Sequence, residues 1–184
     1  DFDRILRSLL ITEPTARVTF LAGRGPVWAA QLRSRIAALA KGAEWSNRIR
    51  ILPRLPSTNY SRILASSTLL LDSYPYSGFT TSIEAMVMGT PVVTIGGSRA
   101  RSSQTSAIMR TISKGNAALL NTFKECWIAD DEAGYVLRVL RLSRDKNYKS
   151  AVSELLKSNI ARFFEEQRAV SSWKKFLYRV ATQC

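Results

Sequence analysis

The fold is decided by the stretch LDSYPYSGFTTSIEAMVMGTPVVTI, residues 71–95. With the apolar residues before it, the stretch begins as a strand over residues 68–72 and continues through a loop rich in Tyr, Pro, Ser and Gly. A helix is predicted over residues 80–88, and residues 91–95 read as the next strand. A strand, a helix and a second strand in this order are typical of the crossover unit of a parallel sheet.

Two further apolar runs lie upstream, at residues 18–23 and 48–52, and both have the length and composition of buried strands. Residues 28–41 and 59–65 favour helices, so helices and strands alternate along the chain. Nearly continuous apolar strands in such an alternation indicate a sheet covered on both faces. We therefore expect an α/β domain with a Rossmann-like, doubly wound parallel sheet.

Beyond Gly96 the pattern becomes helical, apart from a weak strand expected at residues 125–128. Helices are predicted over residues 104–112, 131–142, 148–156 and 160–178. We therefore divide the chain into a Rossmann-like lobe, residues 1–128, and a C-terminal helical tail, residues 129–184, that packs on the lobe. The first residues favour the middle or end of an amphipathic helix, so we expect the N-terminal part of the protein to lie elsewhere.

Composition narrows the function classes. The chain has 184 residues, with 27 Lys and Arg against 14 Asp and Glu, and its net charge is +13. Such a surplus predicts an anionic partner: a nucleotide or phosphosugar, nucleic acid, an acidic protein or a membrane surface. The absence of histidine excludes His-based acid–base chemistry, and two isolated cysteines exclude a metal cluster. We expect no transmembrane span and no signal peptide, and hence an intracellular location, cytoplasmic or in an organelle matrix.

Ligands of open α/β sheets bind beyond the carboxyl ends of the strands, at helix N-termini. The first such junction, residues 23–26, resembles half of a dinucleotide fingerprint, but a plain Gly/Pro turn explains it better, with Arg24 within reach of an anion. The second, residues 53–60, is a two-proline turn whose main chain can read a base edge. Tyr60 is placed to stack on that base, although an aromatic residue there is more often packing.

The third junction carries the strongest signal. The loop brings Gly78 to a helix N-terminus, where free amides and the helix dipole favour an anion. Thr80 and Thr81 add two hydroxyl donors suited to a diphosphate, and Glu84 lies about one turn along the same face, where a carboxylate can hold the vicinal hydroxyls of a ribose. A capping arrangement, with Thr80 as N-cap and Glu84 as a solvated acid, fits the spacing equally well.

Positive charge dominates the segment that follows this junction. No acidic residue occurs from Ala85 to Lys124, and Arg99 and Arg101 directly follow the strand at 91–95. Both arginines are predicted at the same sheet edge as the threonine pair, where they would meet an anionic ligand. The alternative is a generally basic, solvated surface.

Residues 71–84 and 88–94 resemble the donor-binding segment of the protein O-linked N-acetylglucosamine transferases. They are more similar still to the Spindly-type protein O-fucosyltransferases of plants and their bacterial relatives, which carry tetratricopeptide repeats. The stretch from Ile49 to Asp72 matches the spacing of the family without a gap, and the resemblance covers roughly residues 1–115. It implies a GT-B glycosyltransferase, of which this chain is the C-terminal, nucleotide-sugar-binding lobe.

The resemblance also implies roles for individual residues. Thr80 and Thr81 would bind the diphosphate of a UDP- or GDP-sugar, and Glu84 would hold the ribose. The main chain near Leu55 would meet the base, over which Tyr60 would place its ring. No metal is expected, because the helix dipole and basic side chains neutralise the diphosphate. The acceptor would be Ser or Thr of a protein, and the catalytic base would come from an N-terminal lobe outside this chain.

Three departures from the family are visible. Phe79 stands where the O-N-acetylglucosamine enzymes have a histidine, and their basic residue near Ser57 is absent. A family lysine that contacts the diphosphate is expected upstream of Asp1. These departures, with the large positive charge, leave a second hypothesis from another class. In it, the chain is a degenerate, non-catalytic lobe that serves as a structural or binding subunit and docks on nucleic acid or an acidic partner.

Overall fold

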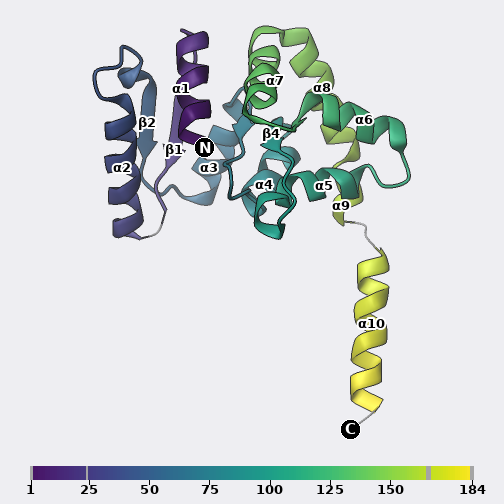
Figure 1. The fold of residues 1–184 in the computed structure, drawn as a ribbon. Helices are drawn as coiled ribbons and strands as arrows, with labels where there is room; N and C mark the ends of the chain where they lie inside the picture. Colours follow the sequence, from purple (N-terminus) through teal and green to yellow (C-terminus); the bar gives the residue numbers. More distant parts are fainter. Residues whose placement is uncertain (1, 24, 165–166, 183–184) are drawn as a thin grey trace.

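The computed structural model describes residues 2–23, 25–164 and 167–182 (Figure 1). Arg24 and Cys184 lie outside the described residues. The strands are β1 (Val18–Leu21), β2 (Ile49–Leu52), β3 (Leu70–Leu71), β4 (Val92–Ile95) and β5 (Ile128–Ala129). The helices are α1 (Phe2–Thr12), α2 (Pro26–Ala40), α3 (Ser57–Ser66), α4 (Thr80–Val87), α5 (Gln104–Ile112), α6 (Ala117–Cys126), α7 (Glu132–Arg144), α8 (Lys146–Asn159), α9 (Ala161–Phe164) and α10 (Gln167–Thr182).

All strand pairs of the described chain are parallel, which confirms the predicted α/β class. β1 pairs with β2, and β4 lies between β3 and β5. The strands thus form a two-stranded and a three-stranded sheet where one continuous sheet was expected. In Figure 1, β1 and β2 lie with α1 and α2 to one side of the sheet that contains β4.

The core is centred on β4, whose four residues are all buried. α7 packs on β4 and β5, α1 packs on α7, and α4 and α5 also contact β4. The predicted amphipathic helix at the start of the chain is α1, which buries Ile5, Leu6 and Leu9. Elements from both ends of the chain therefore contribute to one core, which holds the start of α4 in place.

The region after β4 differs from the prediction. The strand expected at residues 125–128 is instead the end of helix α6 followed by β5, and α6 itself was not predicted. Asn116 caps α6 by accepting a hydrogen bond from the Leu119 amide at 3.0 Å. Tertiary contacts decide this region, because Phe123, Cys126 and Trp127 are buried in the core.

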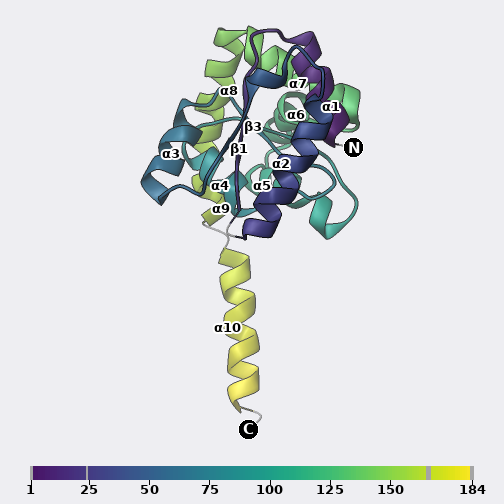
Figure 2. The same ribbon diagram turned by 90° about the vertical axis from the view of Figure 1, so that its left-hand side faces the viewer.

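The predicted helical tail divides into a packed part and an exposed part. α7 to α9 pack on the lobe, whereas every described side chain of α10 is exposed and the helix projects from the lobe (Figures 1 and 2). The packing expected of the whole tail therefore does not extend to α10. No helix of the described chain is both long enough and apolar enough to cross a membrane.

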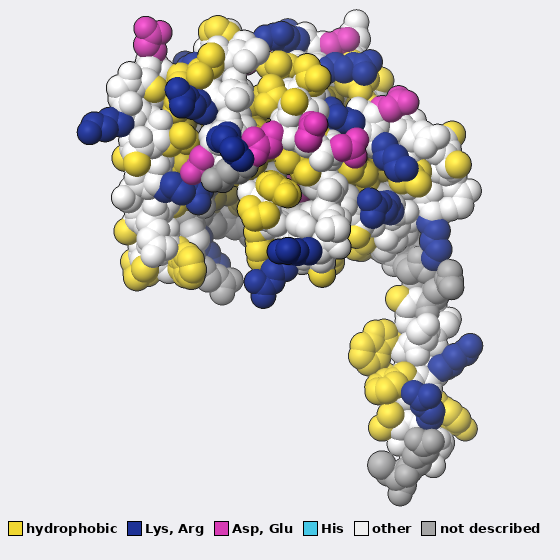
Figure 3. Space-filling view, viewed as in Figure 1, with side chains coloured by type: hydrophobic (Ala, Val, Ile, Leu, Met, Phe, Trp, Pro, Cys, Tyr) yellow, Lys and Arg dark blue, Asp and Glu magenta, His cyan; other side chains and the backbone are white. Residues whose placement is uncertain are grey.

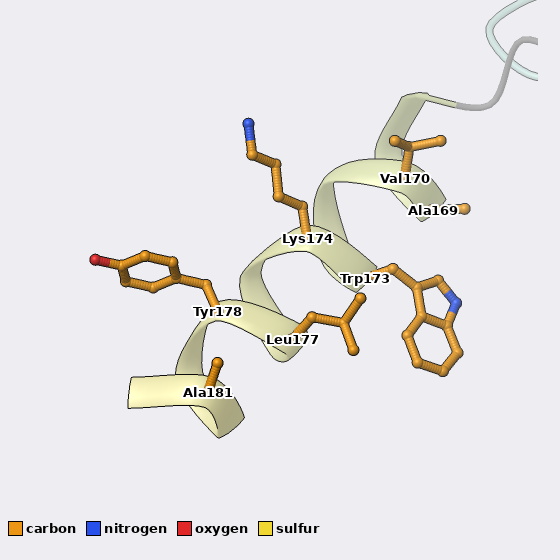
Figure 4. A pocket seen from close by; sticks show the side chains of 7 residues that line it. All are labelled: Ala169, Val170, Trp173, Lys174, Leu177, Tyr178 and Ala181. Carbon is orange, nitrogen blue, oxygen red and sulfur yellow. The ribbon is translucent and has the colours of Figure 1, made fainter. Parts of the chain in front are cut away.

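α10 is amphipathic. Most of its hydrophobic side chains gather on one side, and its basic side chains lie on the other (Figure 3). In the close-up, Lys174 and Tyr178 point away from Trp173 and Leu177 (Figure 4). The hollow along this helix is lined only by residues of α10 itself, so it is an uncovered helix face and not an enclosed cavity. Trp173 is 63% exposed.

Candidate functional site

The loop from Ser73 to Gly78 is held from below by the buried carboxylate of Asp72. Oδ2 of Asp72 accepts hydrogen bonds from the hydroxyls of Ser77 and Thr94, both at 2.7 Å. Oδ1 accepts the backbone N–H of Gly78 at 2.6 Å. Burial raises the pKa of the Asp72 carboxyl, and the hydrogen bonds from Ser77, Gly78 and Thr94 oppose that rise.

Gly78 contributes differently from the sequence prediction. Its N–H, expected to be a free donor for an anion, points inward to Asp72. A Cβ at this position would lie 3.1 Å from Oγ of Ser82 and 3.3 Å from Oδ1 of Asp72. A side chain here would therefore crowd buried polar groups, which favours glycine at this position.

The N-terminus of α4 is open. Phe79 occupies the N-cap position, Thr80 is the first helical residue, and among the described side chains none caps the first turn. The capping alternative, with Thr80 as N-cap, is therefore wrong. Thr80 and Thr81 are exposed. The start of α4 thus offers unpaired amides and two hydroxyls to solvent, an arrangement that attracts an anion.

Three of the predicted site residues come together beside this helix start. Tyr60, on α3, lies near Thr81 and Glu84 on α4, and both residues act on the pKa of its hydroxyl. Burial raises the pKa of Tyr60, Thr81 opposes this rise, and the Glu84 carboxylate adds to it. Tyr60 is half-buried and packs against the core, whereas Glu84 is exposed. The site therefore has one fixed aromatic wall and one free carboxylate.

The two predicted arginines belong to the segment that touches the loop. The backbone N–H of Ser77 donates to the carbonyl of Arg101 at 2.8 Å. Next to it, the carbonyl of Arg99 accepts from the hydroxyls of Ser102 and Ser103. The side chains of both arginines are exposed and have no partner in the described parts of the chain. Main-chain hydrogen bonds thus place these cations at the edge of the loop.

Leu55 is not brought into contact with the other site residues. It lies in the turn between β2 and α3, is half-buried, and its main chain has no hydrogen-bond partner within the described residues. Its free main-chain groups are compatible with the predicted contact to a base, which stays a prediction.

Sequence reasoning missed the polar cluster beneath the site, which consists of Asp72, Ser77, Ser82, Thr94 and Thr105. Thr105 Oγ1 lies 3.0 Å from Ser77 Oγ and 2.7 Å from Ser82 Oγ, and it donates to the Gly78 carbonyl at 2.9 Å. All five side chains are buried. The available signal was an acid that directly follows an apolar strand, because such an acid is buried only when it is hydrogen-bonded.

Two hollows of the surface lie away from this site. A groove of about 470 Å³ runs along the opposite end of α4, past Gly89 and Thr90, to α8, and it carries Lys146, Lys149 and Lys157. Neither this groove nor the hollow along α10 includes Thr80, Thr81 or Glu84. On the visible face of the lobe, basic side chains are interleaved with acidic ones and do not form one patch (Figure 3). The chemistry of its residues, and neither of these two hollows, therefore defines the candidate site.

No known family profile matches this chain, but individual known proteins resemble it. The probable UDP-N-acetylglucosamine–peptide N-acetylglucosaminyltransferase SPINDLY of Solanum lycopersicum is 28% identical over 141 residues, which cover 70% of this chain and 14% of the relative. A mutant O-GlcNAc transferase of Thermobaculum terrenum superposes with a TM-score of 0.75 and 26% identity. That match covers 97% of this chain and 32% of the bacterial one.

The two matches agree with each other and with the parallel α/β architecture. The chain spans less than a third of the structure it matches and a smaller share of the tomato relative. The structural match takes in nearly the whole chain, including the helices after β5. The chain is therefore a glycosyltransferase-like protein, a lobe of the GT-B fold similar to the O-GlcNAc transferases and SPINDLY.

Proposed function

We propose that this chain is the C-terminal, donor-binding lobe of a nucleotide-sugar-dependent glycosyltransferase that modifies Ser or Thr of proteins. The observation that supports the proposal is that Tyr60, Thr81 and Glu84 lie near one another at the uncapped start of α4. One end of this arrangement favours an anion and the other offers a carboxylate. A nucleoside diphosphate has both complementary parts, a diphosphate and a ribose.

Each group then has one task. The amides of the first turn of α4 and the hydroxyls of Thr80 and Thr81 bind the diphosphate, next to the cations of Arg99 and Arg101. Glu84 accepts hydrogen bonds from the ribose hydroxyls. This arrangement stabilises the nucleoside diphosphate as the sugar leaves it, so these residues neutralise the developing charge without a metal.

The base is bound on the other side of the site. The unpaired main chain of Leu55 meets the edge of the base, and the half-buried ring of Tyr60 forms the wall beside it. Gly78 contributes through the shape of its loop and not through its own amide, which Asp72 already holds.

The relatives indicate the rest of the reaction. The tomato relative is named for a UDP-sugar donor and a peptide acceptor, so we propose a UDP- or GDP-sugar and a protein acceptor for this chain. The acceptor site and the catalytic base belong to an N-terminal lobe, joined in the whole protein to tetratricopeptide repeats. We place the reaction inside the cell.

Calorimetry with UDP and GDP tests the proposal. In the double variant Thr80→Ala/Thr81→Ala, we expect binding of the nucleoside diphosphate to weaken by about a hundredfold, or roughly 2.7 kcal/mol. The matched control is Thr122→Ala, which removes a hydroxyl that only bonds the Ala118 carbonyl of its own helix. The control should bind like the wild type.

Two results would contradict the proposal. One is an unchanged affinity in the double variant. The other is a chain that ignores both nucleotides and binds RNA with an affinity that falls steeply with salt, the behaviour of a docking subunit.

A further inference from the structure

The Asp72 carboxylate has no place in the proposed contacts with the ligand, yet both of its oxygens accept hydrogen bonds beneath the site. It is 4% exposed and accepts three hydrogen bonds, from the Gly78 amide and the hydroxyls of Ser77 and Thr94. A buried carboxylate is costly unless such donors surround it. Its position directly under the loop therefore calls for an explanation beyond packing.

The hydrogen bonds of Asp72 join segments that are far apart in the sequence. Through Thr94 the carboxylate is tied to β4, and through Ser77 it reaches Thr105 on α5. The main-chain carbonyl of Asp72 also accepts the hydroxyl of Tyr135 on α7, at 3.0 Å. The loop is thus fastened to three elements of the core at the point where it turns into α4.

This fastening sets the direction of the helix start. The Gly78 amide is drawn inward to Oδ1 of Asp72, two residues before Thr80. Thr80 and Thr81 are exposed, whereas Ser82, the third residue of α4, is buried on Thr105. Two exposed threonines thus lie between two groups that are bonded inward, Gly78 and Ser82. A loop released from Asp72 would no longer hold the threonine pair toward solvent.

The same cluster links the threonine pair to the arginines. Ser77 donates its hydroxyl to Asp72 and its backbone N–H to the Arg101 carbonyl. The buried contacts of the loop therefore hold both the threonine pair and the arginines, which we assign to the diphosphate.

We propose that Asp72 is a positioning residue that holds the loop and the start of α4 in the geometry that accepts a diphosphate, without touching the ligand. The inference rests on the proposed function of the site. An acid suits this task because two acceptor oxygens serve three donors. Asparagine keeps the shape and one acceptor, and the two hydroxyls can turn to accept from its NH₂ group, whereas alanine leaves all three donors unpaired.

The test measures the affinity for UDP and GDP by calorimetry in the wild type, Asp72→Ala, Asp72→Asn and Thr90→Val. We expect a loss of about tenfold or more in Asp72→Ala and within about threefold in Asp72→Asn, at a temperature where all variants are folded. Thr90→Val is the matched control, because Thr90 is 3% exposed and donates a 2.7 Å hydrogen bond to the Leu64 carbonyl at the far end of α4. It should melt earlier than the wild type and bind equally well.

A second measurement is independent of affinity. Hydrogen exchange of the Gly78 amide should rise in Asp72→Ala and stay slow in Thr90→Val. If Asp72→Ala does not fold, Ser77→Ala replaces it, since this change removes the bonds to Asp72 and Thr105 and leaves the acid in place. Its affinity should fall by about three- to tenfold.

The outcomes separate the two proposals. A wild type that binds neither nucleotide overturns the donor-binding function, and the role of Asp72 with it. A wild type that binds, with a folded Asp72→Ala that binds equally well, overturns only the positioning role. Equal losses in Asp72→Ala and Thr90→Val would also overturn it, because the effect would then be general destabilisation.

Discussion

The chain passes from a strand into a helix both between β1 and α2 and between β3 and α4. Both junctions contain glycine and proline in the sequence. At the first, α2 begins on Gly25 and Pro26 without a side-chain cap, and it buries only Ile36 and Ala40. At the second, α4 begins over a cluster of buried polar side chains. At the second junction, a buried acceptor beneath the turn therefore fixes the groups of the turn.

The largest effect should follow from removing the centre of that cluster. In Thr105→Val, the hydroxyl that bonds Ser77, Ser82 and the Gly78 carbonyl is replaced by a methyl group of the same size. Buried partners left unpaired should lower the free energy of unfolding by about 2–3 kcal/mol, measured by urea denaturation. Thr122→Val on α6 is the control and should cost about 0.5 kcal/mol or less. Equal losses of unfolding free energy in the two variants would show that the buried cluster contributes no more to stability than the hydroxyl of Thr122.

An intermediate effect should separate the glycines of the two junctions. In Gly78→Ala the new methyl group meets Ser82 and Asp72 at 3.1 and 3.3 Å, so we expect a loss of about 1–2 kcal/mol. In Gly23→Ala it meets nothing within 4 Å, so the change should be neutral or stabilising by about 0.5 kcal/mol. Thermal melting compares the two variants. A reversed order would mean that the first junction is the more constrained one.

The smallest effect should be a pH dependence confined to the second junction. Burial raises the pKa of Asp72 in the native state above its ordinary value of 3.8, so the native state holds this proton more tightly than the unfolded chain does. The resulting stability is complete below the unfolded pKa and is lost as the pH rises through the native pKa. Asp72→Asn cannot titrate.

The melting temperature of the wild type relative to Asp72→Asn should therefore fall as the pH rises from about 3.8, the ordinary pKa of this group, through its raised native pKa. For Thr90→Val the difference from the wild type should stay constant over the same range. A difference between the wild type and Asp72→Asn that rises with pH would contradict the native pKa shift of Asp72.

The sequence predicted those parts of the fold whose signals are local. Helix α4 and strand β4 were predicted to within about one residue, because apolar runs mark both elements and Gly89 marks the boundary between them. α6 was missed although Asn116 provides a local cap, since the apolar residues that follow it fit a strand as well as a helix. The division into two sheets depends on how β1–β2 and β3–β5 pack, which no local pattern encodes.

The candidate site, too, could be predicted only where its sequence signals are local. Thr80, Thr81 and Glu84 share a helix face, so their spacing was sufficient to place them together. The inward turn of the Gly78 amide depends on Asp72, and Asp72 depends on Thr94, 22 residues away. Ser77 and Thr105 are 28 residues apart. Such a network forms only when the chain has folded, so neither hydropathy nor motif spacing reveals it.

The parallel pairing of the strands has a consequence for how the chain folds. Val18 pairs with Ile49, Leu70 with Val92 and Thr94 with Ile128. Within the described residues, every strand pair therefore encloses a whole crossover and none closes as a local hairpin. Non-local pairing of this kind slows folding, because loop closure comes before any gain in contacts. During synthesis from the N-terminus, Thr94 of β4 emerges 34 residues before its partner Ile128 of β5. The apolar edge of β4 therefore stays open over that interval, the window in which a nascent chain is most exposed to wrong partners.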